Sequence, residues 1–165
     1  RNPRRMTHTI RAATVADAAG ILPIYNRLIR DTTVTFLPHE KTEDEIAEAI
    51  SKADTYLVAI RAGVVTGFAS FGPFRAGAGY ASVKEHSICL DEKVRGSGLG
   101  ARLLDALESE ARAQGVRVMV AGISGENGPG QRFHARQGYQ QVGLMPAIGE
   151  KFGRRLDLVL MQKSL

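Results

Sequence analysis

The chain has 165 residues, of which 44% are hydrophobic and 24% are charged, and its formal net charge is +5. This length and composition predict one globular domain with a single substantial core, which we place at residues 7–165 behind a flexible leader at residues 1–6. No apolar run approaches the length that spans a bilayer, so the composition argues against a membrane protein. The lone cysteine, Cys89, cannot form an internal disulfide, which favours a cytoplasmic location.

The positive charge invites a nucleic-acid interpretation, but the basic residues are dispersed among acidic ones. No basic helix face carries interleaved aromatic residues, and no zinc or RNP-type motif is present. A positive surface equally suits an anionic small molecule, which it attracts by electrostatic steering. We therefore expect neither a nucleic-acid partner nor a membrane partner.

The first third of the chain predicts a short strand and two helices. Residues 8–13 alternate as a strand does, and residues 14–25 carry apolar side chains at helical spacing. Pro23 predicts a kink or break near Leu22, because proline lacks the amide donor. Residues 31–36 are too β-branched for a helix and are expected to be extended. A capping box of Thr42 and Glu45 then opens the second helix.

The remaining pattern alternates strands and helices. Ala62-Gly63 joins two strands as a hairpin, and Gly115 ends the longest helix as a C′ residue. The expected strands are 55–61, 64–71, a run near 85–94, 116–123, 139–144 and 156–161; the later helices are 99–114 and 129–138; and the loops are 72–79 and 145–155. This order predicts an α+β fold with a mixed sheet rather than a doubly wound one.

The stretch from Glu85 to Gln114 reads as a buried strand, a glycine-rich turn and an amphipathic helix. The first turn of a helix leaves backbone N–H groups unpaired, and its dipole adds partial positive charge. Glycines allow a phosphate to approach such a backbone closely. The turn therefore predicts a pyrophosphate site, with Arg95 and Arg102 adding charge.

The spacing of the glycines narrows the choice of ligand. The turn lacks the Lys-Ser/Thr ending of a nucleotide P-loop and misses the G-x-G-x-x-G dinucleotide spacing. An ordinary strand–helix turn remains the alternative. The pattern Arg95-x-x-Gly98-x-Gly100 resembles the coenzyme A motif of the GNAT acetyltransferase superfamily, whose element order is the one predicted above.

Further segments resemble one GNAT subfamily, the phosphinothricin and methionine sulfoximine/sulfone N-acetyltransferases. They are residues 24–26, 32–33, 67–75, 133–139 and 149–157. The resemblance covers nearly the whole chain from about Ile10. Arg155 departs from it, standing where the subfamily has Trp, as do Gly77, Ala81 and Lys84.

The resemblance implies acetyl-coenzyme A as cosubstrate, no metal, and a homodimer. The cofactor-binding residues that it implies are Ile88, Cys89, Leu90, Arg95, Gly96, Ser97, Gly98, Leu99, Gly100, Ala101 and Asn127. The pantetheine arm would extend the sheet along Ile88–Leu90. Cys89 reads as a buried small hydrophobe without a partner that would make it a nucleophile, so transfer through a ternary complex is expected.

Two residues are predicted to be catalytic. Glu85 lies in an apolar strand, where partial burial raises a carboxylate's pKa towards that of a general base; a solvated edge glutamate is the alternative. His134 stands where many superfamily members carry a tyrosine that protonates the leaving thiolate, although a surface position is also open. His86 points to the opposite face of the strand from Glu85 and is expected to be structural.

The resemblance also implies an acceptor pocket. Arg75 is the candidate partner of an acceptor carboxylate, because a guanidinium binds a carboxylate through two hydrogen bonds. The other acceptor-binding residues implied are Phe36, Ala78, Gly79, Tyr80, Lys151 and Phe152. In the implied dimer, Lys151 and Phe152 would close the pocket from the partner subunit.

The predicted activity is acetyl transfer to the α-amine of a small amino-acid-like compound. Another acceptor on the same fold, such as a polyamine, an aminoglycoside or a protein N-terminus, is the nearest alternative. A regulatory module that binds coenzyme A without turnover is a more distant one.

Overall fold

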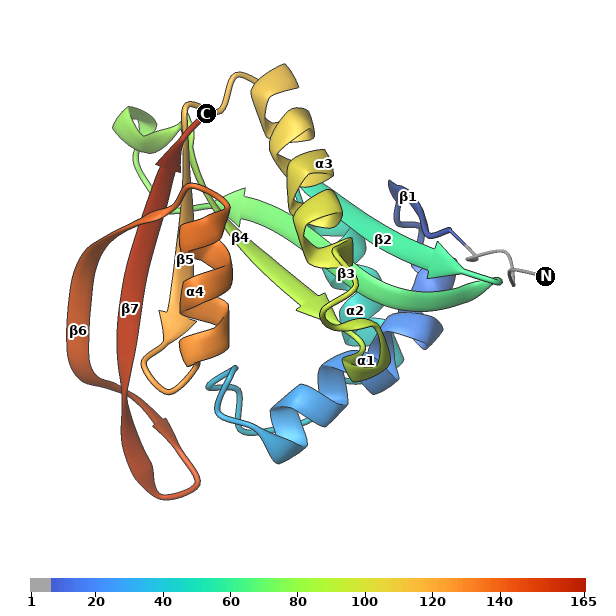
Figure 1. Cartoon of the computed structure of the whole chain (residues 1–165), viewed down its shortest axis with the longest axis horizontal. Helices are drawn as coiled ribbons and strands as arrows, with labels where there is room; N and C mark the ends of the chain where they lie inside the picture. The colour runs from blue at the N-terminus through green and yellow to red at the C-terminus, as the bar shows by residue number, and fades with distance from the viewer. Residues whose placement is uncertain (1–6) are drawn as a thin grey trace.

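A seven-stranded sheet in the order β1-β2-β3-β4-β5-β7-β6 runs through the computed structural model, which describes residues 7–165 (Figure 1). The predicted leader at residues 1–6 lies outside the described residues. The strands are β1 (Thr9–Ala12), β2 (Thr55–Arg61), β3 (Val64–Pro73), β4 (Val83–Leu90), β5 (Val118–Ser124), β6 (Gln140–Lys151) and β7 (Arg154–Ser164). The helices are α1 (Ala18–Asp31), α2 (Glu43–Lys52), α3 (Leu99–Ala113) and α4 (Gly128–Arg136), with 3-10 turns η1 (Val15–Asp17), η2 (Ala78–Tyr80) and η3 (Glu92–Val94).

The predicted element order and the mixed sheet are confirmed. Within residues 7–165 only β4 and β5 pair in parallel, and the other neighbouring strands pair antiparallel. No helix in this range is long and apolar enough to cross a membrane.

Helices cover the two faces of the sheet with separate apolar cores. The face under α3 buries Leu103, Leu104 and Leu107 against strand residues such as Phe71 and Met119. The opposite face buries α1 and α2 side chains against Phe68 and Val58. Each side chain on β4 therefore points either towards α3 and α4 or towards α1 and α2.

The predicted break near Leu22 is wrong, because α1 continues through Pro23 to Asp31. A proline inside a helix costs about 3 kcal/mol. The helix buries Ile21, Ile24, Leu28 and Ile29, and each fully buried aliphatic side chain contributes about 1.5–3 kcal/mol. Burial of this apolar face therefore outweighs the cost of the proline.

The predicted loop at residues 145–155 is also wrong. Strand β6 runs on to Lys151, and a two-residue turn at Phe152 and Gly153 leads into β7. Both turn residues have positive φ angles, 53° and 71°, as a tight hairpin of this twist requires. Register shifts between Gln141 and Gly143 and between Met145 and Gly149 allow β6 to continue through a stretch that its glycines and basic residues suggested was a loop. Figure 1 shows the two strands as a long ribbon at one side of the sheet.

Strands β4 and β5 pair only over part of their length. Their register runs from Val83 opposite Val118 to His86 opposite Ala121. Beyond His86, β4 continues beside β3 as far as Leu90, and in the described part of the chain no strand pairs with its other side. This one-sided segment, Ser87–Leu90, presents backbone donors and acceptors to whatever lies between the two strands.

Candidate active site

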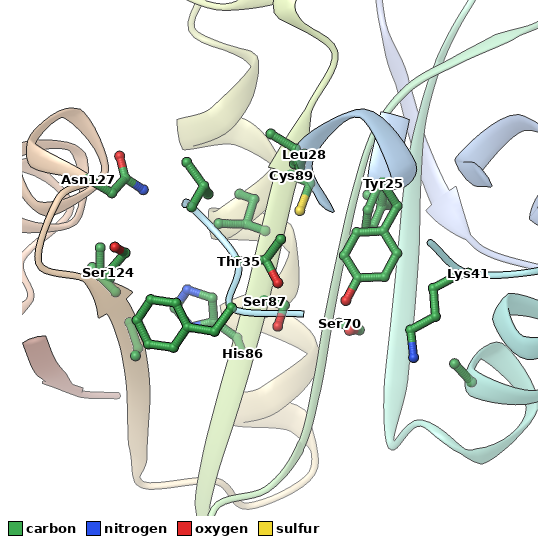
Figure 2. A pocket seen from close by; sticks show the side chains of 18 of the residues that line it. Tyr25, Leu28, Thr35, Lys41, Ser70, His86, Ser87, Cys89, Ser124 and Asn127 are labelled. Carbon is green, nitrogen blue, oxygen red and sulfur yellow. The ribbon is translucent and has the colours of Figure 1, made fainter. Parts of the chain in front are cut away.

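A cavity of about 400 Å³ opens where β4 and β5 part. Its walls come from α1, the segment after it, α2, β2–β5, α4 with the residue before it, and β7. Figure 2 shows Ser124, Asn127 and His86 towards one end, Ser87 and Thr35 in the middle, and Tyr25, Ser70 and Lys41 towards the other. The cavity therefore runs from the gap between the strands to the space below α1 and α2.

Glu85 does not itself line this cavity but lies beside it, next to Gly122. One carboxylate oxygen approaches Gly122, a lining residue of β5, so closely that a Cβ at position 122 would lie 3.2 Å from it. The side chain is half-buried, and this burial raises the pKa of the Glu85 carboxyl group. A carboxylate with a raised pKa, beside a cavity that can hold an amine, is suited to accept a proton.

His86 and His134 form a buried pair on the other face of β4. Their Nε2 atoms lie 3.0 Å apart, and the Nδ1 atom of His134 lies 2.8 Å from the carbonyl oxygen of Gly130. Since a carbonyl can only accept, His134 donates from Nδ1, and its Nε2 accepts from His86. Burial lowers the pKa of His134 and lowers that of His86 to about 3, so both rings stay neutral.

The positions of His86 and His134 can be compared with the predictions of a structural role for His86 and a catalytic role for His134. His86 does point to the opposite face from Glu85, where it contacts α4. His134 also lines the cavity, but both of its ring nitrogens are engaged inside the protein. The sequence signal for the pair was alternation along β4, which sends residue 86 to the face that α4 covers.

Cys89 lines the cavity and packs against the apolar core on the α1 and α2 side of the sheet. Burial raises the pKa of its thiol to about 12. The thiol therefore stays protonated at neutral pH and is a poor nucleophile.

The glycine turn follows β4 and opens α3. Gly96 and Gly98 have φ angles of 74° and 85°, and a Cβ at either position would meet no atom within 4 Å. The turn backbone therefore faces open space beside the first turn of α3, which begins at Leu99. Such a turn fits an anionic group held by backbone N–H donors. Arg95 borders a neighbouring groove beside α1, and Arg102 donates to the backbone oxygen of His8.

The predicted cofactor residues thus fall into three places along the strand and its neighbours. Ile88, Cys89 and Leu90 lie on the one-sided segment of β4, and Gly96, Ser97, Gly98, Leu99, Gly100 and Ala101 form the turn and helix start. Asn127 lines the cavity and caps α4, its side-chain oxygen accepting from the Gly130 amide at 3.0 Å. The free strand edge leads from the cavity to the turn, so these residues fit an extended thioester with a diphosphate.

Residues 32–36, the cover segment, close the cavity beside α1. Phe36 lines the cavity and packs on Gly149 of β6, where a Cβ would lie 2.5 Å from the ring. Lys151, also on β6, donates to the backbone oxygens of Thr32 and Thr35 at 2.6 and 2.8 Å. Lys151 is buried and acts on the cover segment rather than on the cavity itself.

Glu126 ties the cover segment to the loop before α4. Its carboxylate accepts from Thr33 at 2.8 Å and from both guanidinium nitrogens of Arg154. Hydrogen bonds from Arg154 and then Thr33 lower the pKa of Glu126 to about 2.

The other predicted acceptor residues lie outside the cavity of the single chain. Arg75 is exposed and its guanidinium lies 5.6 Å from the ring centre of Tyr80. Ala78, Gly79 and Tyr80 form η2, and Phe152 stands exposed in the β6–β7 turn. None of the five lines the cavity, so the structure of the single chain does not bring Arg75 to it.

Sequence reasoning missed the lining residues on the α1 and α2 side. They are Tyr25, Lys41, Tyr56, Ser70 and Ser87. Tyr25 reads as an apolar helix position and Tyr56 as an ordinary strand residue, so only the tertiary structure reveals their proximity at Phe68. In residues 7–165 no cluster of three His, Cys, Asp or Glu side chains could hold a metal ion.

Comparison with known proteins identifies the class. The profile of the "Acetyltransferase (GNAT) family" matches residues 21–139, and the chain belongs to this family. It is an N-acetyltransferase, as its relatives are named.

Particular relatives narrow the type. The L-methionine sulfoximine/L-methionine sulfone acetyltransferase of Pseudomonas aeruginosa is 41% identical over 97% of this chain and 96% of its own length. The phosphinothricin N-acetyltransferase of Streptomyces viridochromogenes is 34% identical over 99% of this chain and 91% of its own. A crystal structure of a phosphinothricin acetyltransferase from Sinorhizobium meliloti in complex with AcCoA is 35% identical, with a TM-score of 0.91 and coverage of 97% and 89%. The chain is an acetyltransferase of this methionine sulfoximine and phosphinothricin type.

Proposed function

We propose that the chain transfers the acetyl group of acetyl-coenzyme A to the α-amine of a small amino-acid-like acceptor, with L-methionine sulfone, L-methionine sulfoximine or phosphinothricin as models. The observation that carries the proposal is the half-buried Glu85 carboxylate beside a cavity of about 400 Å³ and near the free edge of β4. A cavity of this size suits a small acceptor.

Backbone groups on and after β4 hold the donor in this proposal. The N–H and C=O groups of Ile88–Leu90 bind the pantetheine arm, and the amides of residues 96–101 bind the diphosphate. When bound, acetyl-coenzyme A supplies the acetyl group as a thioester. In this proposal an N–H of the one-sided segment donates to the carbonyl oxygen as negative charge develops there.

Glu85 removes the proton from the acceptor amine. Its raised pKa makes the carboxylate a stronger base than an exposed glutamate. Because the Cys89 thiol stays protonated, the acetyl group passes directly between the two bound molecules rather than through the protein. The amine nitrogen bonds to the acetyl carbon, the C–S bond breaks, and coenzyme A leaves as a thiolate that takes up a proton. The His86–His134 pair holds the last turn of α4 against β4, and Asn127 caps the start of the same helix.

A release assay for free thiol tests the activity and the acceptor together. We expect turnover with methionine sulfone, methionine sulfoximine or phosphinothricin, and background rates with polyamines, aminoglycosides and peptides. Turnover confined to polyamines or peptides would contradict the amino-acid assignment. Thiol release with none of the panel, despite binding of acetyl-coenzyme A, would favour a regulatory module.

We also propose that the chain forms a homodimer in the cytoplasm. Apolar side chains of β6 and its turn stand exposed, at 52–59% of their surface for Val142, Leu144, Ile148 and Phe152, and such a patch favours a protein contact. Sedimentation at micromolar concentration should give twice the mass of one chain. A monomer would rule out the dimer and leave Phe152 without a role in a partner's site.

A further inference from the structure

A row of hydroxyl groups crosses three strands on the α1 and α2 side of the cavity. Tyr56 of β2 lies opposite Ser70 of β3, and Ser70 lies opposite Ser87 of β4. Side chains directly opposite one another in a sheet share a face, and all three line the cavity. With strands about 4.8 Å apart, the row spans about 10 Å.

A fourth hydroxyl comes from the helix above the row. Tyr25 of α1 packs edge-on against Phe68 with ring centres 5.6 Å apart, and Tyr56 stacks on the same ring at 6.1 Å. Phe68 is buried, so it fixes both phenol rings. Figure 2 shows the hydroxyls of Tyr25, Ser70 and Ser87 turned towards the same space.

The chemistry of this hydroxyl cluster (Tyr25, Tyr56, Ser70 and Ser87) is that of hydrogen-bond donors without formal charge. Burial raises the pKa of both tyrosines, so the phenols keep their protons. The ammonium of Lys41, at the same end of the cavity, lies 3.7 Å from the carboxylate of Glu45, so the charged groups there form a pair of opposite sign. An apolar acceptor tail would leave these donors unpaired, whereas oxygen atoms on the tail would accept from them.

Position along β4 orients the acceptor. Glu85 and Ser87 are two residues apart and therefore point to the same face. An amine at Glu85 places the rest of a small acceptor over Ser87 and towards Ser70 and the tyrosines. The end of the molecule that meets the hydroxyl cluster is then the end of its side chain.

We infer that the hydroxyl cluster recognises hydrogen-bond-accepting oxygen atoms at the end of the acceptor's side chain, and so selects oxidised or oxygen-bearing amino acids over their apolar isosteres. This inference rests on the proposed function, since it takes the acceptor to be an amino acid whose amine lies at Glu85. It assigns specificity to residues outside the catalytic and coenzyme-binding sets.

The test compares L-methionine sulfone with L-methionine, which has the same chain without the two oxygens. Tyr56→Phe and Ser70→Ala each remove one hydroxyl and keep the fold, which a thermal melt checks. We expect kcat/KM for the sulfone to fall about 3- to 12-fold per hydroxyl, as for a lost neutral hydrogen bond. The value for methionine should stay within about twofold, so the preference for the sulfone collapses in the double variant. Ser51→Ala, on the exposed side of α2, is the matched control.

Each outcome decides the inference. Equal losses for both substrates, or no loss for the sulfone, would overturn it while leaving the acetyltransferase activity intact. A wild-type enzyme that acetylates the two amino acids equally would also overturn it. Failure of the proposed function would look different, because the wild-type enzyme would then release no thiol with any amino acid.

Discussion

Lys151 offers a test of how the cover segment shapes the cavity. Its ammonium donates to the backbone oxygens of Thr32 and Thr35, and it is only 4% exposed. We predict that Lys151→Met, which keeps the length of the side chain, destabilises the fold and raises the KM of the acceptor. The cover segment would lose its attachment to β6, and Phe36 would no longer be held at the cavity.

The expected size follows from the contacts. Hydrogen bonds of a charged donor contribute about 1.5–3 kcal/mol each. Part of the free energy lost with these hydrogen bonds is offset, because the methionine variant does not bury a charged ammonium. We expect a net loss of about 2 kcal/mol, which for a chain of this length lowers Tm by about 4–8 °C.

Thermal unfolding and steady-state kinetics measure the two effects. Lys52→Met is the matched control, because Lys52 is 75% exposed and, among residues 7–165, forms an ion pair only with Glu48 on the same helix. Such a contact is worth about 0.5 kcal/mol or less. A Tm and an acceptor KM that both match the wild type would refute the assignment of Lys151 to the cover segment. If only the KM of acetyl-coenzyme A rose, Lys151 would instead be assigned to the binding of acetyl-coenzyme A.

Three further changes probe the site. Glu85→Gln should lower kcat by about 10²- to 10⁴-fold and abolish the acidic limb of the pH–rate profile, in which the rate falls as pH drops through the raised pKa of Glu85. Burial makes the folded form bind this proton more tightly than the unfolded chain does, so the free energy of unfolding falls as pH rises through that pKa. The Gln variant should therefore melt no lower than the wild type at pH 7. A lower Tm for the variant would contradict the expected direction of this pH dependence. Gly98→Ala forces a residue with a Cβ atom to adopt a φ of 85°, so we expect the free energy of unfolding to fall by about 1 kcal/mol. Calorimetry should also show weaker binding of acetyl-coenzyme A. Unchanged binding would mean that the turn does not hold the diphosphate. His86→Leu leaves the Nε2 atom of His134 buried without a partner and should lower the free energy of unfolding by about 1–3 kcal/mol. The same substitution made in a His134→Leu background should cost less, because the two side chains interact. Additive losses in the double variant would exclude this interaction.

Local patterns were enough to predict the fold. The capping box at Thr42, the Ala62-Gly63 hairpin and the helix end at Gly115 are short-range signals, and each has the expected structure. Two predictions were wrong, the helix break near Leu22 and the loop at residues 145–155. In both places the helix or strand continues through residues that usually interrupt regular structure. Burial of the α1 face and the bulges in β6 compensate there, and neither is visible in the local sequence.

The site was less accessible to sequence reasoning, because its walls come from segments far apart in the chain. Glu85 and the glycine turn could be found, since they belong to one continuous stretch. The contact of His86 with His134 and the row from Tyr56 to Ser87 depend on the strand order and register. Lys151 was expected at the acceptor, but only the tertiary structure shows it holding the segment next to it.

The one-sided segment of β4 has a consequence for the order of events in the proposed reaction. Amides of Ser87–Leu90 that find no neighbouring strand should exchange their hydrogens with solvent quickly in the free enzyme. An extended pantetheine arm would take the place of that strand and slow this exchange. Since Ser87 and Cys89 also form the floor of the acceptor end, the donor would complete the surface on which the acceptor rests, which favours kinetics in which acetyl-coenzyme A binds first.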